Sequence, residues 1–373
     1  MSEVQSSERI EDWVAKEGKA RSAAGKGSGG RGGKRKLWII LAVVIVLLVI
    51  ALIFLIGHFV KKKKTGTPLG NIMYLSGLDV MCGPNGIAPM EDGSFLVTDV
   101  FGKKIWKADM TGAEVYAGAA TEKDPSGEPL GGYKDGSLEE SLFKEPWAIV
   151  PFLDGYAVSD TKNNAVRLVR GSTVETVNGS SDVLEMGDMG VIFDQPTGLA
   201  ADDQGRLFVA DTARGTIYVI TEQGRVEVYE EGLVRPMGLC WADGALYVAE
   251  TGENRILQIK DGSMIVLAGT GEEGDDNGIA SKATFSSPQG VTVGDDGAVY
   301  VSDTVNGTVR RIKDGMVDTV LEYAGDALST YPTSPVGMCY KDHALYVCDV
   351  FSRRVYVLVQ ARYLISYILP LQY

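Results

Sequence analysis

The chain has 373 residues, of which 46 are glycine, and 45% of its side chains are hydrophobic. This composition is typical of a folded, turn-rich protein and excludes a disordered chain. The net charge of −13 is unevenly distributed, because residues 65–373 carry 44 Asp/Glu against 23 Lys/Arg. So acidic a region repels phosphate backbones, which excludes nucleic acid as a partner and leaves cationic peptides, divalent ions and neutral ligands.

The N-terminal part predicts a membrane anchor. Residues 37–56 contain no charged side chain, and a helix of that length spans a hydrocarbon core of roughly 30 Å. We predict a single transmembrane helix over 37–60, a linker over 61–70 and a basic, flexible cytoplasmic tail over 1–36. Lys/Arg residues are more numerous on the N-terminal flank of the anchor, so we expect the rest of the chain to lie outside the cell, at the plasma membrane.

From residue 71 onward a short pattern repeats. Each copy begins with Pro-x-Gly, replaced by Pro-Trp-Ala in the second copy, and an acid follows 14 or 15 residues later. The six prolines are Pro84, Pro146, Pro196, Pro236, Pro288 and Pro335. The six acids are Asp99, Asp160, Asp211, Glu250, Asp303 and Asp349. Because each copy reads as four short strands separated by turns, we predict an all-β, six-bladed β-propeller of four-stranded antiparallel blades over residues 71–360.

Two segments compete to close the ring. The sixth copy ends its third strand near Val359 and needs an outer strand, since an open edge invites aggregation. The segment Ile72–Ser76 resembles the fourth strands of other copies but precedes the first Pro-x-Gly step. Closure by this N-terminal strand is the simplest solution, and Tyr363–Leu371, within an apolar C-terminal tail over 361–373, is the alternative.

The repeat resembles the NHL-repeat family of β-propellers. The stretch 288–312, PQGVTVGDDGAVYVSDTVNGTVRRI, matches that repeat almost end to end, and the spacer at 268–290 is echoed at 131–148. The resemblance implies the propeller fold and allows several functions, because such propellers serve as binding scaffolds, sensor domains and a few enzymes. The first and sixth copies depart from the pattern, with Asp-Val-Phe at 99–101 and 349–351 where the others have Asp-Thr or Glu-Thr.

The six repeated acids have two interpretations. They could form a cation-binding crown near one face of the propeller. Alternatively, an acid at the end of a strand accepts hydrogen bonds from backbone donors of the next turn, which explains its presence in every copy without a ligand. We favour the structural interpretation.

A catalytic metal centre lacks suitable ligands in the sequence. Amidating lyases with a similar propeller hold zinc through several histidines, whereas the only histidine beyond the anchor is His343. Calcium needs oxygen ligands alone, and Asp275, Asp276 and Asn277 follow two glutamates in one loop. These residues are a weak calcium site candidate against the alternative of a solvated acidic loop. Otherwise we expect no cofactor, and we interpret Cys240, Cys339 and Cys348 as small core residues, with a Cys339–Cys348 bridge as an alternative for the last two.

The residue inside each Pro-x-Gly step is predicted to face the axial channel. These positions are Asn85, Trp147, Thr197, Met237, Gln289 and Val336. No acid or base is among them, so the set suits a ligand-contact rim or simple packing better than a reaction centre. We therefore predict a membrane-tethered module, or a sensor signalling through the anchor, that binds a peptide, protein or glycan. A calcium-dependent hydrolase of the gluconolactonase type is the alternative.

Overall fold

A computed structural model describes the chain from the start of the predicted propeller to the end of its last repeat. The ranges described are 71–75, 81–119, 122–177, 193–221, 224–321 and 333–359, all within the unit Lys64–Tyr373. The predicted tail (1–36), transmembrane helix (37–60), linker (61–70) and C-terminal tail (361–373) lie outside these ranges. Within the described ranges no helix combines the length and the apolar character needed to cross a membrane.

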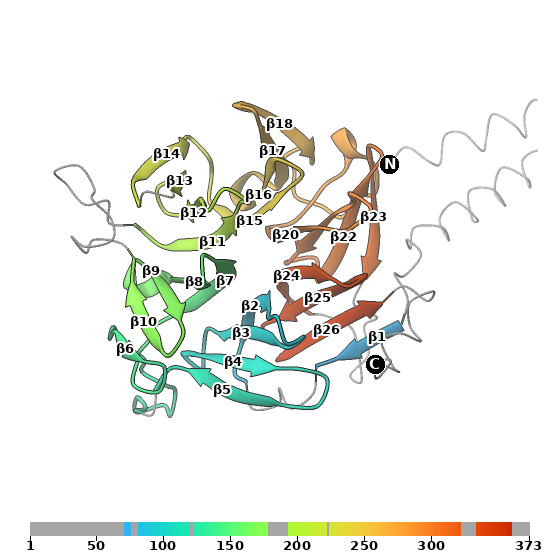
Figure 1. The fold of residues 1–373 in the computed structure, drawn as a ribbon. Helices are drawn as coiled ribbons and strands as arrows, with labels where there is room; N and C mark the ends of the chain where they lie inside the picture. The colour runs from blue at the N-terminus through green and yellow to red at the C-terminus, as the bar shows by residue number, and fades with distance from the viewer. Residues whose placement is uncertain are drawn as a thin grey trace, which may run out of the picture. The chain divides into compact units, whose positions relative to one another are not determined.

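The first three blades follow one another around the axis, each with its first strand innermost (Figure 1). Blade one comprises β2 (Pro84–Pro89), β3 (Phe95–Asp99), β4 (Lys104–Ala108) and β5 (Ala113–Ala117). Blade two comprises β7 (Pro146–Phe152), β8 (Gly155–Asp160), β9 (Ala165–Arg170) and β10 (Thr173–Thr176), with β6 (Gly136–Ser137) outside β10. Blade three comprises β11 (Pro196–Ala201), β12 (Leu207–Asp211), β13 (Thr216–Ile220) and β14 (Val226–Glu230).

The other three blades complete the ring. Blade four comprises β15 (Pro236–Ala242), β16 (Ala245–Glu250), β17 (Arg255–Lys260) and β18 (Ser263–Ala268). Blade five comprises β20 (Pro288–Val293), β21 (Val299–Asp303), β22 (Thr308–Lys313) and β23 (Met316–Leu321), with β19 (Gly278–Ile279) outside β23. Blade six comprises β24 (Pro335–Lys341), β25 (Ala344–Asp349), β26 (Arg354–Val359) and β1 (Asn71–Tyr74).

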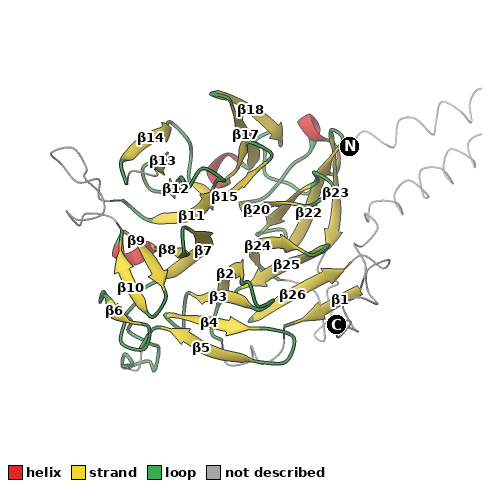
Figure 2. Ribbon diagram, in the orientation of Figure 1, coloured by secondary structure: helices red, strands yellow, loops and turns green. Residues whose placement is uncertain are grey.

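Three single-turn 3₁₀ helices are the only helices in the described ranges, and all lie in loops between strands (Figure 2). They are η2 (Thr161–Asn163), η3 (Thr251–Glu253) and η4 (Ala280–Lys282). The prediction of a six-bladed, all-β propeller is therefore confirmed. It differs in one detail, since blades two and five carry a fifth, two-residue strand.

The ring closes through the N-terminal strand. β1 pairs antiparallel with β26 from Asn71 opposite Val359 to Tyr74 opposite Tyr356, and the Leu75 N–H continues the ladder to the Val355 carbonyl. Closure by the N-terminal segment is thus confirmed, and the competing segment Tyr363–Leu371 lies outside the described ranges. The two ends of the propeller are consequently held in one sheet, which leaves no strand of blade six missing.

Hydrophobic packing lies between blades rather than within them. Six clusters of buried side chains are found, one between each pair of neighbouring blades. The cluster between blades six and one joins Phe95 to Tyr346, with ring centroids 4.2 Å apart, and includes Leu75. Because both faces of each sheet are covered, every residue of second strands such as β12 and β21 is buried.

The glycine of the Pro-x-Gly step has a packing role. A Cβ added to Gly198, Gly238, Gly290 or Gly337 would lie 2.0–2.4 Å from a carbonyl oxygen of the next blade's first strand. At these four positions the innermost strands therefore approach too closely for a side chain. The second blade carries Ala148 instead, and its amide donates to the Ser159 hydroxyl, which bridges to the Thr197 carbonyl.

Candidate functional site: the axial cavity

A cavity of about 380 Å³ runs along the axis of the propeller. The first strand of each blade lines it, so β2, β7, β11, β15, β20 and β24 all contribute (Figure 1). The first residue of each of these strands pairs with the repeated acid at the end of the second strand, as Pro146 does with Asp160. The Pro-x-Gly steps and the acids thus lie at the same face of the propeller.

Five of the six residues predicted to face the axis line this cavity: Asn85, Trp147, Met237, Gln289 and Val336. Among the five, only Trp147 and Gln289 are partly exposed. Thr197 is not in the lining, because its hydroxyl contacts the Thr212 hydroxyl at 2.6 Å and the Met237 carbonyl at 3.2 Å. The structure therefore brings five of the six predicted residues together around the cavity, and Thr197 is the exception. A role of these residues in ligand binding stays a prediction.

The rest of the lining is apolar, aromatic and sulfur-bearing. Cys240, Met338, Cys339 and Trp241 join the predicted residues, and Asp202 is the one charged side chain in this lining. Asp202 is held by Arg206 at 2.5 Å and by the Arg206 amide at 2.8 Å, and its side chain is buried. Burial raises the pKa of the Cys240 thiol to about 11, so that thiol is protonated and unreactive at neutral pH.

The repeated acids are fully buried and form the same contact in every blade. Each accepts a hydrogen bond from the backbone N–H of the residue two positions before the blade's proline, at 2.5–3.0 Å. The six donors are Cys82, Lys144, Asp194, Val234, Ser286 and Thr333. Each acid therefore fastens the strand entry of its own blade, which is the contact expected from a structural role.

The residue after the acid joins neighbouring blades. In blades two to five it is a threonine whose hydroxyl donates to the proline carbonyl of the following blade at 2.6–2.8 Å. These threonines are Thr161, Thr212, Thr251 and Thr304. Valine occupies the position in blades one and six, where no hydroxyl is available.

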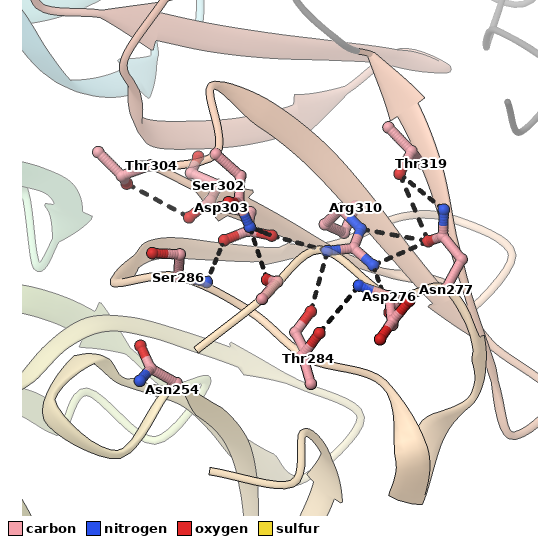
Figure 3. Close-up of polar contacts among 12 residues, drawn as sticks. Asn254, Asp276, Asn277, Thr284, Ser286, Ser302, Asp303, Thr304, Arg310 and Thr319 are labelled. Atoms are coloured by element: carbon pink, nitrogen blue, oxygen red, sulfur yellow. Dashed lines mark hydrogen bonds and ion pairs between the residues drawn. The ribbon is translucent and has the colours of Figure 1, made fainter. Parts of the chain in front are cut away.

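The candidate calcium loop is engaged by a buried arginine (Figure 3). The Arg310 guanidinium donates to Asp303 at 2.7 Å, to the Asn277 amide oxygen at 2.8 Å and to the Asp276 carbonyl at 2.9 Å. It also stacks over the Phe285 ring. The Asn277 side-chain oxygen and the Asp276 backbone carbonyl thus already contact a guanidinium, and no group of three or more His, Cys, Asp or Glu able to hold a metal occurs in the described ranges.

Blade two contains the same arrangement. Arg167 is fully buried and donates to Asp160 at 3.0 Å and to Asp135 at 2.6 Å, between the rings of Tyr133 and Phe143. Sequence reasoning missed both arginines, although each stands seven residues after its acid and the two blades that carry them are those preceded by the related spacers at 131–148 and 268–290. Each of these spacers contains one of the two-residue fifth strands, β6 or β19.

The remaining candidate groups lie apart from the cavity or are inert. His343 adopts a positive φ in the turn before β25 and contacts Asp295 on the surface, at 2.6 Å. All four cysteines are free, so the alternative Cys339–Cys348 bridge is absent. Burial raises the pKa of Cys339 and of Cys348 above the usual thiol range.

Comparison with known proteins agrees with this architecture. The NHL repeat pattern matches residues 193–220 and 285–312, which are the cores of blades three and five. NHL repeat-containing protein 2 of Bos taurus is 25% identical over 267 residues, covering 62% of this chain and 33% of that protein. The chain spans a third or less of the length of the curated relatives it matches. The repeats and these relatives support an NHL-type β-propeller.

Solved structures are similar in fold. A gluconolactonase from Xanthomonas campestris superimposes with a TM-score of 0.56 and 14% identity, covering 79% of this chain and 91% of that one. A catalytically inactive histidine-to-alanine variant of virginiamycin B lyase from Staphylococcus aureus gives 0.51 and 13%, covering 78% and 99%. At such low identity the likeness extends to the fold alone.

Proposed function

We propose that this chain is a membrane-tethered binding module whose propeller takes up a peptide, protein or glycan ligand at the axial cavity. The observation that carries the proposal is the lining of that cavity. It is apolar and aromatic with a few neutral polar groups, which is the usual character of ligand pockets. Trp147 is the largest side chain of the predicted rim, and its partial exposure leaves it available for contact.

Catalysis finds little support in the same lining. The thiol of Cys240 is protonated at neutral pH, and the carboxylate of Asp202 is already paired with Arg206. The catalytically inactive variant of virginiamycin B lyase carries alanine in place of a histidine. In this chain His343 lies in a surface turn and is not part of the cavity lining. A calcium-dependent lactonase remains the alternative that the gluconolactonase-like fold suggests, and its test is hydrolysis of a lactone with added calcium.

The proposal of a transmembrane anchor is based on the sequence. Residues 37–56 carry no charge, and basic residues outnumber acids on the N-terminal side. We propose that 37–60 crosses the plasma membrane once, with residues 1–36 in the cytoplasm and the propeller outside. Protease added to intact cells should then remove the propeller and leave the tail; digestion of the tail with protection of the propeller would reverse the orientation.

The experiment for the binding site compares the full chain with Trp147→Ala on a glycan array and a random peptide library. An aromatic contact at the centre of a site is worth roughly 2 kcal/mol, so Trp147→Ala should weaken a rim ligand about 30-fold. A Trp147→Ala chain that keeps the wild-type melting temperature and every wild-type ligand would contradict the axial site.

A further inference from the structure

The turns that follow the repeated acid in blades one and six differ from the other four turns in three ways. They read Val-Phe-Gly-Lys-Lys at 100–104 and Val-Phe-Ser-Arg-Arg at 350–354. We call these two turns the Phe turns. They are neighbours across the closed ring, because Gly83 lies beside both of them. A Cβ added to Gly83 would lie 2.5 Å from the Phe101 ring and 3.1 Å from a methyl group of Val350.

The first difference removes a stabilising contact. The threonine hydroxyl that joins neighbouring blades in blades two to five is replaced by Val100 and Val350, which cannot donate. A hydrogen bond of this kind contributes to stability, and its absence at two of six positions is offset only by apolar packing, since Val100 is buried and Val350 packs against the cluster between blades six and one.

The second difference is backbone strain. The residue four positions after the acid has a positive φ in all six blades, between 48° and 64°. Blades two to five place Asn or Gly there, the residues that adopt this conformation most readily: Asn164, Gly215, Asn254 and Gly307. The Phe turns instead hold Lys103 at φ 58° and Arg353 at φ 57°. Long cations are thus retained at a position where they strain the backbone, and such strain points to function.

The third difference is what the Phe turns display. Phe351 is 71% exposed and Phe101 is 43% exposed, although phenylalanine usually avoids water. Arg353 beside them is exposed as well. An aromatic and cationic surface has therefore formed on a part of the chain that carries 44 Asp/Glu against 23 Lys/Arg.

From these three differences we propose that the Phe turns form a binding site for an acidic peptide segment of a partner protein. Apolar side chains of that segment would pack on Phe101 and Phe351, while its carboxylates would lie beside the exposed Arg353; the Lys103 ammonium is partly buried and donates to the Val100 carbonyl of its own turn. Aromatic residues and arginine supply most of the binding energy at such surfaces, and complementary charge selects the partner. This site is separate from the axial cavity, because none of its residues lines that cavity.

A peptide fits the site better than an anionic membrane does. A lipid surface is extended and would be repelled by the net negative charge of residues 65–373, whereas a short segment contacts only the local cations.

The test selects random peptides on the purified full chain and measures their affinities for five single variants. Peptides that combine Asp/Glu with an aromatic residue or leucine should be enriched. Phe351→Ser and Arg353→Glu should each weaken them about tenfold or more, a hot-spot effect. Leu153→Ser, a similarly exposed apolar side chain in the turn between β7 and β8, is the matched control and should change nothing.

Arg353→Gly separates function from structure. Glycine relieves the positive φ, so this variant should melt no lower than wild type and yet lose peptide affinity. The proposal is overturned if no acidic peptides are enriched or if Phe351→Ser and Arg353→Gly bind them as wild type does. It is also overturned if the variants lose binding to phosphatidylserine vesicles while peptide affinity is unchanged, since the site would then recognise lipid. Trp147→Ala should leave these peptides bound, which distinguishes this site from the axial one.

Discussion

At the residue scale, the glycine of each Pro-x-Gly step lets the innermost strands meet. A Cβ on Gly290 would lie 2.0 Å from the Val336 carbonyl oxygen, and neither backbone can move without disturbing its own sheet. We expect Gly290→Ala to lower the free energy of unfolding by about 2–3 kcal/mol through overpacking, measured by denaturant titration. Gly112→Ala is the control, because nothing lies within 4 Å of its added Cβ and its φ is not positive. Equal stabilities for the two variants would refute the packing role.

The pH dependence of alkylation at Cys240 tests whether the thiol of this residue is enclosed in the cavity lining. Its pKa is raised to about 11 by burial, so the reactive thiolate is scarce at neutral pH. Alkylation of Cys240 in the folded chain should therefore be slow and should rise about tenfold with each pH unit up to that pKa, followed by peptide mass spectrometry. The unfolded chain supplies the reference, with an ordinary pKa near 8.5. A folded chain that reacts as fast as the unfolded one at pH 7 would show that the thiol is not enclosed.

At the scale of single elements, the buried arginines hold the two spacers against their blades. Arg310→Met would leave the buried carboxylate of Asp303 without its cation, and we expect a loss of about 3–5 kcal/mol of stability in thermal or denaturant unfolding. Arg311→Met is the matched control: its partner Asp318 is partly exposed, so at most about 1 kcal/mol should be lost.

The same variant should respond to acid. Burial already raises the pKa of Asp303 above its usual range, and removal of Arg310 would raise it further. The folded variant then binds a proton that the unfolded chain does not, so lowering the pH favours folding. The stability difference between Arg310→Met and wild type should therefore narrow from pH 7 towards pH 5. A difference that widens over this range would show that Asp303 is not the group left unpaired.

Strand β1 carries the closure of the ring. Removing residues 71–77 would expose the edge of β26 and part of the cluster around Leu75, so that deletion should lower the melting temperature and promote aggregation. Removal of 363–371 should have little effect on either property. If the C-terminal deletion were the more damaging of the two, that segment would be the one that completes blade six in solution.

At the scale of the whole molecule, the fold was predictable because its signal is local and repeated. Six prolines and six acids at constant spacing predict six blades, and the acids turn out to accept the same backbone N–H in each. The fifth strands β6 and β19 were not predicted, since each has two residues and depends on a distant strand rather than on its own sequence.

The candidate site was predictable only in part. The residue inside each Pro-x-Gly step can be placed near the axis from the repeat, yet the Thr197 hydroxyl contacts Thr212 of the same blade and donates to the Met237 carbonyl of the next blade, and no local pattern records these contacts. Cys240 and Cys339, which line the cavity, share one repeat position four residues after the proline, but the small residues at that position in other blades, Ala88, Ala200 and Thr292, led to their interpretation as core. Contacts across blades decide which side chains of an inner strand reach the axis.

The central claim is that ligands bind at the axial cavity. The most direct measurement is the dissociation constant of a ligand selected on the full chain, compared between wild type, Trp147→Ala and Phe351→Ser. For a ligand of the axial cavity the account predicts a loss of about 30-fold for Trp147→Ala with an unchanged melting temperature, and no loss for Phe351→Ser; acidic peptides bound by the Phe turns should show the reverse pattern. Identical affinity of Trp147→Ala and wild type for every selected ligand, or turnover of a ligand by the wild-type chain, would contradict it.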